Sequence, residues 1–88
     1  DLAITEAGNV RIMITHGDQY DVKHTTGFLI KEGISQNADL IIFGHTHIPY
    51  LNDKSDPVLL NPGSMKAGSY ATVIIDDKGI RCDLKEIG

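Results

Sequence analysis

The sequence contains no tryptophan, a single cysteine and no apolar run that approaches the ~20 residues of a membrane-spanning helix. The lone cysteine, Cys82, excludes a disulfide within the chain and fits a reducing compartment, so we expect a cytoplasmic protein with no membrane span. Positive charge is also scarce. Eight Lys and Arg residues face twelve Asp and Glu, for a net charge of -4, which argues against a nucleic-acid-binding surface.

What remains is the composition of an ordinary soluble globular chain, with 41% hydrophobic and 23% charged residues in 88 positions. A chain of this length fits one small domain, so residues 1–88 are treated as a single unit. Because the first residue is Asp1 and the chain opens inside an apparent strand, we expect that an amino-terminal part of the protein is missing.

Apolar and β-branched runs predict strands over residues 2–5, 10–15, 39–43, 58–61, 70–76 and 80–87. Gly8 and Asn9 favour a hairpin turn between the first two strands. The continuous apolar run at 39–43 is typical of a central strand that is buried on both faces. The last three strands are expected to complete the same sheet.

One helix is predicted over residues 25–37, with Thr25 or Thr26 as its amino-terminal cap. Its expected apolar face consists of Phe28, Leu29, Ile30 and Ile34. A strand, helix, strand unit therefore lies inside a mixed sheet, and the fold class is α/β or α+β.

Histidines follow two of the predicted strands directly. The strand at 10–15 runs into "HGD" at 16–18, and the strand at 39–43 runs into "GHTH" at 44–47. If these strands are parallel neighbours, the right-handed crossover brings His16, His45 and His47 to one edge of the sheet. Gly17 and Gly44 would permit the tight turns there. The end of the strand at 58–61 would bring Asn61 and Ser64 to the same edge if its direction agrees.

Each of these residues has an ordinary structural interpretation as well. A single buried histidine such as His16 is more often a satisfied core residue than a ligand. His45 and His47 differ, because two imidazoles one residue apart at a strand end suit a metal better than a core. Asp18 and Asp21 are ligands, acceptors for His16 or solvated loop carboxylates, and His24 is assigned no chemistry.

The motifs "THGD", "ADLIIFGHTHIPY" and "LLNPGSM", in this order, resemble the last three signatures of the calcineurin-like metallophosphoesterases. The resemblance covers residues 10–75 and points to their small bacterial and archaeal phosphodiesterase branch. It implies part of a four-layer αββα sandwich with a two-metal centre, in which His16 and His45 bind one ion and His47 binds the other. The supporting residues that it implies are Gly17, Asp18, Gly44, Thr46, Asn61, Gly63 and Ser64.

The sequence departs from this family pattern in two places. Asp18 stands where the family often has a second histidine, which puts the role of that position in orienting solvent or substrate in doubt. The remaining ligands of the family are a bridging aspartate, an Asp-x-His pair and an asparagine followed by the catalytic histidine. These belong to an amino-terminal half that this chain lacks, so we expect the chain alone to be inactive.

The resemblance implies hydrolysis of a phosphodiester small molecule by a hydroxide that two divalent ions generate, with manganese, nickel, zinc or iron as the metal. The first alternative is a non-catalytic scaffold of the same fold, as in a subunit of membrane-trafficking coats. The second is a mononuclear zinc hydrolase or structural zinc domain built on three histidines. The expected partners are the amino-terminal half and, because half a sandwich leaves apolar faces uncovered, a homo-oligomer.

Overall fold

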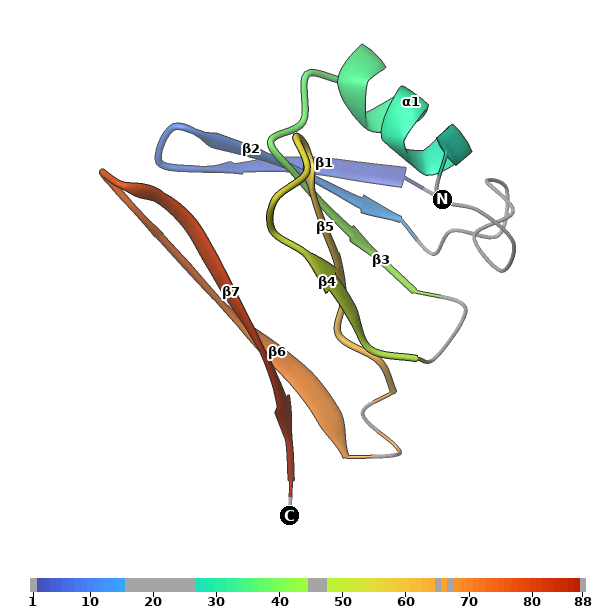
Figure 1. Cartoon of the computed structure of the whole chain (residues 1–88). Helices are drawn as coiled ribbons and strands as arrows, with labels where there is room; N and C mark the ends of the chain where they lie inside the picture. The colour runs from blue at the N-terminus through green and yellow to red at the C-terminus, as the bar shows by residue number, and fades with distance from the viewer. Residues whose placement is uncertain (1, 16–26, 45–47, 65, 67, 88) are drawn as a thin grey trace.

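The computed structural model describes residues 2–15, 27–44, 48–64, 66 and 68–87, which form one helix and seven strands (Figure 1). In chain order the elements are β1 (Leu2–Ala7), β2 (Val10–Thr15), α1 (Gly27–Ser35), β3 (Leu40–Phe43), β4 (Tyr50–Asn52), β5 (Val58–Asn61), β6 (Ser69–Asp76) and β7 (Gly79–Glu86). The mixed α+β class is confirmed.

Five strands form one mixed sheet in the order β1-β2-β3-β5-β4. β1 and β2 make the predicted hairpin, which turns at Gly8 in the left-handed region with a φ of 61°. β3 is parallel to β2 on one side and to β5 on the other, so the predicted central strand is confirmed. Its Leu40 and Ile41 are fully buried, as a strand covered on both faces requires.

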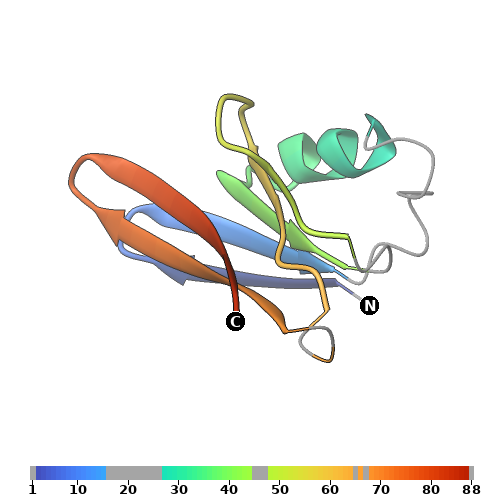
Figure 2. The same ribbon diagram turned by 60° about the horizontal axis from the view of Figure 1, so that its bottom comes forward.

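The expectation that the last three strands complete one sheet is wrong. β5 stays in the five-stranded sheet, whereas β6 and β7 pair only with each other as a separate antiparallel hairpin. The physical reason is that β4, which the sequence reading missed, pairs with the side of β5 that β6 would have needed. The β6–β7 hairpin therefore packs over one face of the sheet, opposite α1, as Figure 2 shows.

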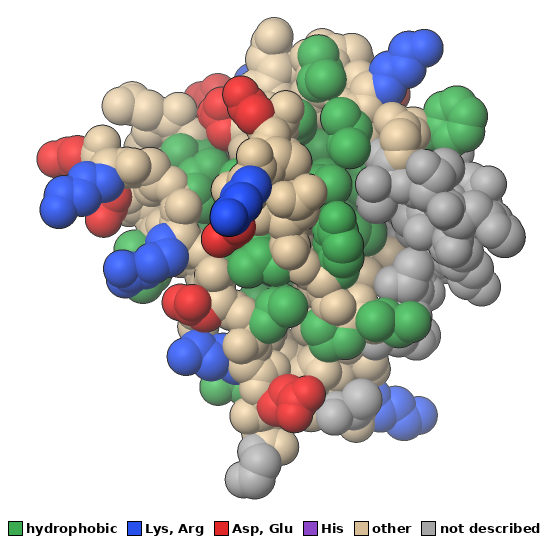
Figure 3. All heavy atoms as spheres, in the orientation of Figure 1, with side chains coloured by type: hydrophobic (Ala, Val, Ile, Leu, Met, Phe, Trp, Pro, Cys, Tyr) green, Lys and Arg blue, Asp and Glu red, His purple; other side chains and the backbone are tan. Residues whose placement is uncertain are grey.

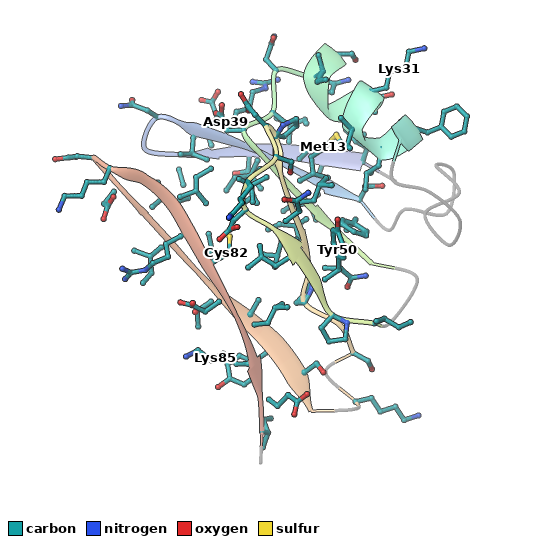
Figure 4. The ribbon with its side chains drawn as sticks, in the orientation of Figure 1. Met13, Lys31, Asp39, Tyr50, Cys82 and Lys85 are labelled. Carbon is teal, nitrogen blue, oxygen red and sulfur yellow. The ribbon has the colours of Figure 1, made fainter. Side chains whose placement is uncertain are left out.

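Two apolar clusters fill the spaces between these three layers. On the helix side, the cluster consists of Met13, Leu29, Ala38, Ile41, Phe43 and Leu59. On the hairpin side, it consists of Val10, Ile12, Leu40, Leu60 and Cys82. Figure 4 shows Met13 on the helix side of the sheet and Cys82 between the hairpin and the sheet. Alternate residues of β2 and β3 therefore serve opposite faces of one sheet.

The helix buries only part of the apolar face that was predicted, because Leu29 is buried and Ile30 is partly buried against the same cluster. α1 covers Gly27–Ser35, within the predicted range, and its buried residues are Leu29 and Gly33. Phe28 and Ile34 are 61% and 59% exposed, so their place in the apolar face was wrong. The reason is that Gly33 has no side chain and Ile41 packs into the space that one would fill. The helix therefore approaches β3 on the side of Gly33 and Leu29, and Phe28 and Ile34 face away. Thr25 and Thr26, the predicted caps, lie outside the described residues.

Within the part of the chain that the structure describes, no helix is long and apolar enough to cross a membrane.

Candidate functional site

The carboxyl ends of β2, β3 and β5 lie side by side at one edge of the sheet. Thr15, the last residue of β2, pairs with Phe43, the last residue of β3. β5 runs in the same direction, with Leu60 opposite Ile42. The parallel arrangement that the histidine motifs required is therefore present. Residues that continue from these three ends leave the sheet from neighbouring points.

An open cavity of about 650 Å³ lies at this edge. Its lining consists of Leu2, Ala3, Ile14, Thr15, Ile42, Phe43, Gly44, Asn61, Pro62 and Gly63. None of these described lining residues carries a charge. A second cavity of about 610 Å³ lies at the other end of the sheet, where its lining includes Asp39, Asp56, Asp76 and Asp77. The first cavity is the better candidate, because ligands of open sheets gather beyond the carboxyl ends of parallel strands.

Buried polar side chains also gather at this edge. Among the described residues, the buried polar side chains are Thr15, Asn61 and Ser69, with exposed fractions of 5%, 1% and 8%. Asn61 is at the end of β5, and its Oδ1 accepts a hydrogen bond from the Gly63 N–H at 2.9 Å. The buried side-chain nitrogen and oxygen atoms of the described residues all have hydrogen-bond partners. The buried polar side chains at this edge are thus satisfied, in contrast to the apolar side chains in the interior of the sheet.

The two ends of the stretch 44–49 are held next to each other. Phe43 precedes this stretch and Tyr50 follows it, and their ring centroids are 6.3 Å apart at a tilt of 57°. Tyr50 also pairs with Asn61 across β4 and β5, which puts β4 beside the end of β5 (Figure 4). Sequence reasoning missed this closure. The available signal was an aromatic residue on each side of the histidine motif.

The structure brings together only some of the residues that were predicted for the site. Gly44, Asn61 and Gly63 line the cavity, and the Ser64 carbonyl accepts a hydrogen bond from the Ser69 N–H at 3.0 Å. The other predicted residues lie outside the described ones, namely His16, Gly17, Asp18, His45, Thr46 and His47. Their ligand roles stay predictions. No group of three or more His, Cys, Asp or Glu suited to a metal occurs among residues 2–15, 27–44, 48–64, 66 and 68–87.

The residue types that follow these strand ends in the sequence are ones that bind divalent transition metals. His16 is the next residue after Thr15, and His45 is the next residue after Gly44, so both follow strand ends that lie side by side. Imidazole nitrogen is a good ligand for zinc, nickel and iron, and a carboxylate such as that of Asp18 suits manganese. Gly44 has no side chain to obstruct the approach of a ligand at the cavity wall.

Burial raises the pKa of the Cys82 thiol above its ordinary value of 9.0, and the nearby carboxylates of Asp53 and Asp83 raise this pKa further. This thiol is therefore protonated at neutral pH and is a poor metal ligand or nucleophile. Lys and Arg side chains are spread over the face drawn in Figure 3, and hydrophobic side chains form a band beside them.

Comparison with known proteins points in one direction. Residues 1–78 match the model of the calcineurin-like phosphoesterase superfamily domain. The chain is 41% identical over 59 residues to a protein named probable metallophosphoesterase from Methanothermobacter thermautotrophicus, covering 67% of this chain and 34% of that protein. It is 32% identical over 83 residues to probable metallophosphoesterase YsnB of Bacillus subtilis, covering 88% of this chain and 49% of that protein.

Solved structures give the same result at the level of the fold. A predicted phosphoesterase from Streptococcus pneumoniae superposes with a TM-score of 0.85 at 28% identity, covering 97% of this chain and 53% of that one. Vps29 of Entamoeba histolytica, solved with zinc, superposes with a TM-score of 0.73 at 22% identity, covering 98% and 60%. The latter likeness shows the fold alone. The chain spans between about a third and three fifths of the lengths of these proteins.

Proposed function

Since this chain belongs to the calcineurin-like phosphoesterase superfamily, we propose that it supplies the carboxyl-terminal half of a metal-dependent phosphodiesterase. Membership in this superfamily supports phosphoester hydrolysis in general. The proposal adds that the substrate is a phosphodiester. The observation that carries it is the parallel pairing of Thr15 with Phe43. Because of this pairing, the two histidine motifs start from adjacent strand ends beside one cavity.

In the proposed site, His16 and His45 ligate one divalent ion and His47 ligates a second one. When bound, such ions supply a nucleophile at neutral pH and neutralise charge on the phosphoryl group. Manganese, nickel, zinc and iron all suit this donor set. The remaining ligands and the catalytic histidine come from an amino-terminal half that pairs with this chain.

The described residues of this chain hold and shape the site. Thr15 and Asn61 are buried at the ends of β2 and β5, the two strands that flank β3. Gly44 and Gly63 line the cavity without side chains, which leaves room for a phosphoester beside the strand ends. Because the described residues of the lining carry no charge, the proposal assigns the neutralisation of phosphate charge to the ions.

The alternative function is a non-catalytic scaffold that binds other proteins. It is supported by the superposition on Vps29, which is a likeness of fold only. The sequence favours the metal enzyme, because a scaffold has no chemical need for His45 and His47 one residue apart at a strand end. A mononuclear three-histidine zinc site is the other alternative, and metal stoichiometry separates it from the two-metal proposal.

The test is metal content combined with phosphodiester hydrolysis. The chain and the complete product of its gene are loaded with manganese, nickel or zinc, and bound metal per chain is measured by elemental analysis. Bis(p-nitrophenyl) phosphate serves as the generic substrate. The variant is His45→Ala/His47→Ala, and His24→Ala is the matched control outside the motif. We expect the complete product to bind two ions per molecule and to hydrolyse the substrate. The double variant should lose metal binding and hydrolysis, and the control should keep them.

Three results would contradict parts of the proposal. Metal binding by the complete product without hydrolysis of any phosphodiester would remove the enzymatic function and favour the scaffold. A single ion that the short chain binds as tightly as the complete product would favour the mononuclear zinc site. A double variant that keeps full metal content would exclude His45 and His47 as ligands.

A cytoplasmic location and self-association of the short chain are further parts of the proposal. Cell fractionation tests the location, and light scattering tests the self-association.

A further inference from the structure

Gly63 lies where three segments of the candidate edge meet. Its φ is +83°, in the left-handed region. A Cβ at this position would be 2.7 Å from Pro49 Cγ and 2.9 Å from Ser69 Cβ. Both distances are far below the ~3.5 Å at which carbon atoms pack. The bare Cα of Gly63 is therefore required by its neighbours as well as by its own backbone conformation.

The three segments belong to different parts of the fold. Gly63 itself follows β5, and its N–H is held by Asn61 Oδ1 at 2.9 Å. Ser69 begins β6, and its N–H is bound to the Ser64 carbonyl at 3.0 Å. Pro49 comes directly before β4, which pairs with β5. Gly63 thus joins the end of the central sheet to the start of the hairpin layer.

Pro49 ends the stretch that carries the predicted metal ligands. It follows His47 by two residues, and the neighbouring Tyr50 contacts Phe43 at the other end of the same stretch. Pro49 is exposed, and its ring lies against the bare Cα of Gly63. A displacement of this proline would move one end of the covalent segment to which His45 and His47 belong.

We propose that Gly63 is a positioning residue of the metal site, which seats Pro49 against its bare Cα and thereby sets the downstream end of the stretch with His45 and His47. This inference rests on the proposed function, because it assumes that these histidines bind metal. It goes beyond that function by assigning a specific contact. The competing interpretation is that Gly63 serves only the left-handed turn after β5.

Gly68 provides a matched control for that competing interpretation. Its φ is +87°, nearly equal to that of Gly63, and a Cβ there would meet nothing closer than Ile87 O at 3.6 Å. Gly68→Ala therefore imposes the same backbone strain without an overlap. Any difference between Gly63→Ala and Gly68→Ala reports the contacts of Gly63 with Pro49 and Ser69.

The experiment uses the complete gene product and compares Gly63→Ala, Gly68→Ala, Pro49→Ala and the double variants Pro49→Ala/Gly63→Ala and Ser69→Gly/Gly63→Ala. Pro49→Ala removes the Cγ and Cδ atoms, which lie 2.7 and 3.1 Å from the added Cβ. Three readouts are taken, namely the Tm, the dissociation constant for cobalt(II), and the visible absorption of the cobalt(II)-loaded protein. The last two respond to the ligand sphere and not to stability as such.

We expect Gly63→Ala to weaken cobalt(II) binding by about 10- to 100-fold and to change the visible spectrum, as loss of an outer-shell support does. Gly68→Ala should lower the Tm alone. Pro49→Ala should weaken cobalt(II) binding on its own, because the ring that packs against Gly63 is lost. The variant Pro49→Ala/Gly63→Ala should bind like Pro49→Ala and better than Gly63→Ala, a non-additive result that identifies direct contact.

Several outcomes would overturn the inference. If Gly63→Ala lowers the Tm as Gly68→Ala does and leaves cobalt(II) binding intact, Gly63 serves the turn alone. If Ser69→Gly restores binding and Pro49→Ala does not, the effect passes through β6 instead. If Gly63→Ala does not fold, unchanged binding in Pro49→Ala decides against the contact. A wild-type protein without bound metal would instead show that the proposed function itself had failed, and the inference would fall with it.

Discussion

Arg11 and Asp39 exchange two hydrogen bonds at the edge of the sheet opposite the candidate site. The Arg11 N–H donates to Asp39 Oδ2 at 2.9 Å, and the Asp39 N–H donates to the Arg11 carbonyl at 2.8 Å. The Asp39 carbonyl in turn accepts the Val58 N–H at 3.0 Å. Asp39 therefore joins the amino-terminal ends of β2, β3 and β5, whose other ends form the candidate site.

Replacing Asp39 with Ala is expected to lower the free energy of unfolding by about 0.5–1.5 kcal/mol, because the Arg11 N–H loses its side-chain acceptor. The measurement is urea denaturation followed by circular dichroism. Asp39→Asn keeps an acceptor oxygen and serves as the control, with a smaller loss. Equal stability of Asp39→Ala and wild type would show that water replaces the carboxylate without cost.

The contact between Gly33 and Ile41 predicts an unusual result for a helix substitution. Alanine favours a helix over glycine by about 1 kcal/mol, but overpacking of a tight core costs about 1–3 kcal/mol. Since a Cβ at Gly33 would overlap Ile41 Cδ1 and lie 3.3 Å from Pro57 Cγ, we expect Gly33→Ala to destabilise the protein.

The matched test is Ile41→Val, which removes the overlapping Cδ1 atom. In this background Gly33→Ala should be less destabilising than in the wild type, and thermal denaturation of the four proteins of the cycle measures the difference. A Gly33→Ala variant that is more stable than wild type would mean that the helix moves away from β3 without cost.

Asn61 is nearly inaccessible, so its side chain has consequences for stability as well as for the site. Asn61→Ala removes the acceptor of the Gly63 N–H, and the loss is expected to be about 1–3 kcal/mol, as for other buried polar groups left without a partner. Asn61→Ser, with a shorter acceptor, is the comparison. Denaturant unfolding measures both, and a loss confined to phosphodiester hydrolysis would contradict the structural role.

The raised pKa of Cys82 gives the stability a pH dependence on the alkaline side. Because the folded thiol has a pKa above the ordinary 9.0, the folded state holds its proton more tightly than the unfolded chain does. The contribution to stability is therefore complete below pH 9 and is lost as the pH rises above this value towards the folded pKa. Stability measured against pH should fall less steeply above pH 9 in Cys82→Ala.

A reactivity measurement checks the same point independently. Cys82 is only 5% exposed, so a thiol reagent at pH 8 should label the folded chain slowly and the urea-unfolded chain rapidly. Rapid labelling of the folded chain at pH 8 would contradict both its burial and the direction of its pKa shift.

Local patterns in the sequence were sufficient for much of the fold. The turn at Gly8, the hairpin and the parallel β2, α1, β3 unit all followed from periodicity and turn residues. Leu29 and Ile30 were correctly expected to face the core. The burial of Gly33 could not be obtained in this way, because its contact with Ile41 comes from β3 and leaves no trace in the periodicity of the helix. β4 escaped notice since Tyr50–Asn52 is too short to show alternation. Missing it led to the assignment of all later strands to one sheet.

Some features of the candidate site could likewise be predicted from local sequence, and others could not. The motifs at strand ends predict which edge carries chemistry, and this stays a prediction. Gly44 and Asn61 line a cavity at this edge. The contacts that organise this edge join residues from different motifs, such as Gly63 with Pro49 and Phe43 with Tyr50. Contacts of this kind depend on where separate strands end in space. A single sequence without its fold does not contain that information in readable form.

The separation between the two edges of the central sheet also bears on how such proteins diversify. Asp39 ties the strands together at one end, and the residues beyond Thr15, Gly44 and Asn61 extend from the other. Loops that extend from a rigid support can change in length and sequence without disturbing the core. Relatives of this chain can therefore acquire new specificities by altering the segments that follow these three strand ends, while the same few strands continue to determine whether the chain folds.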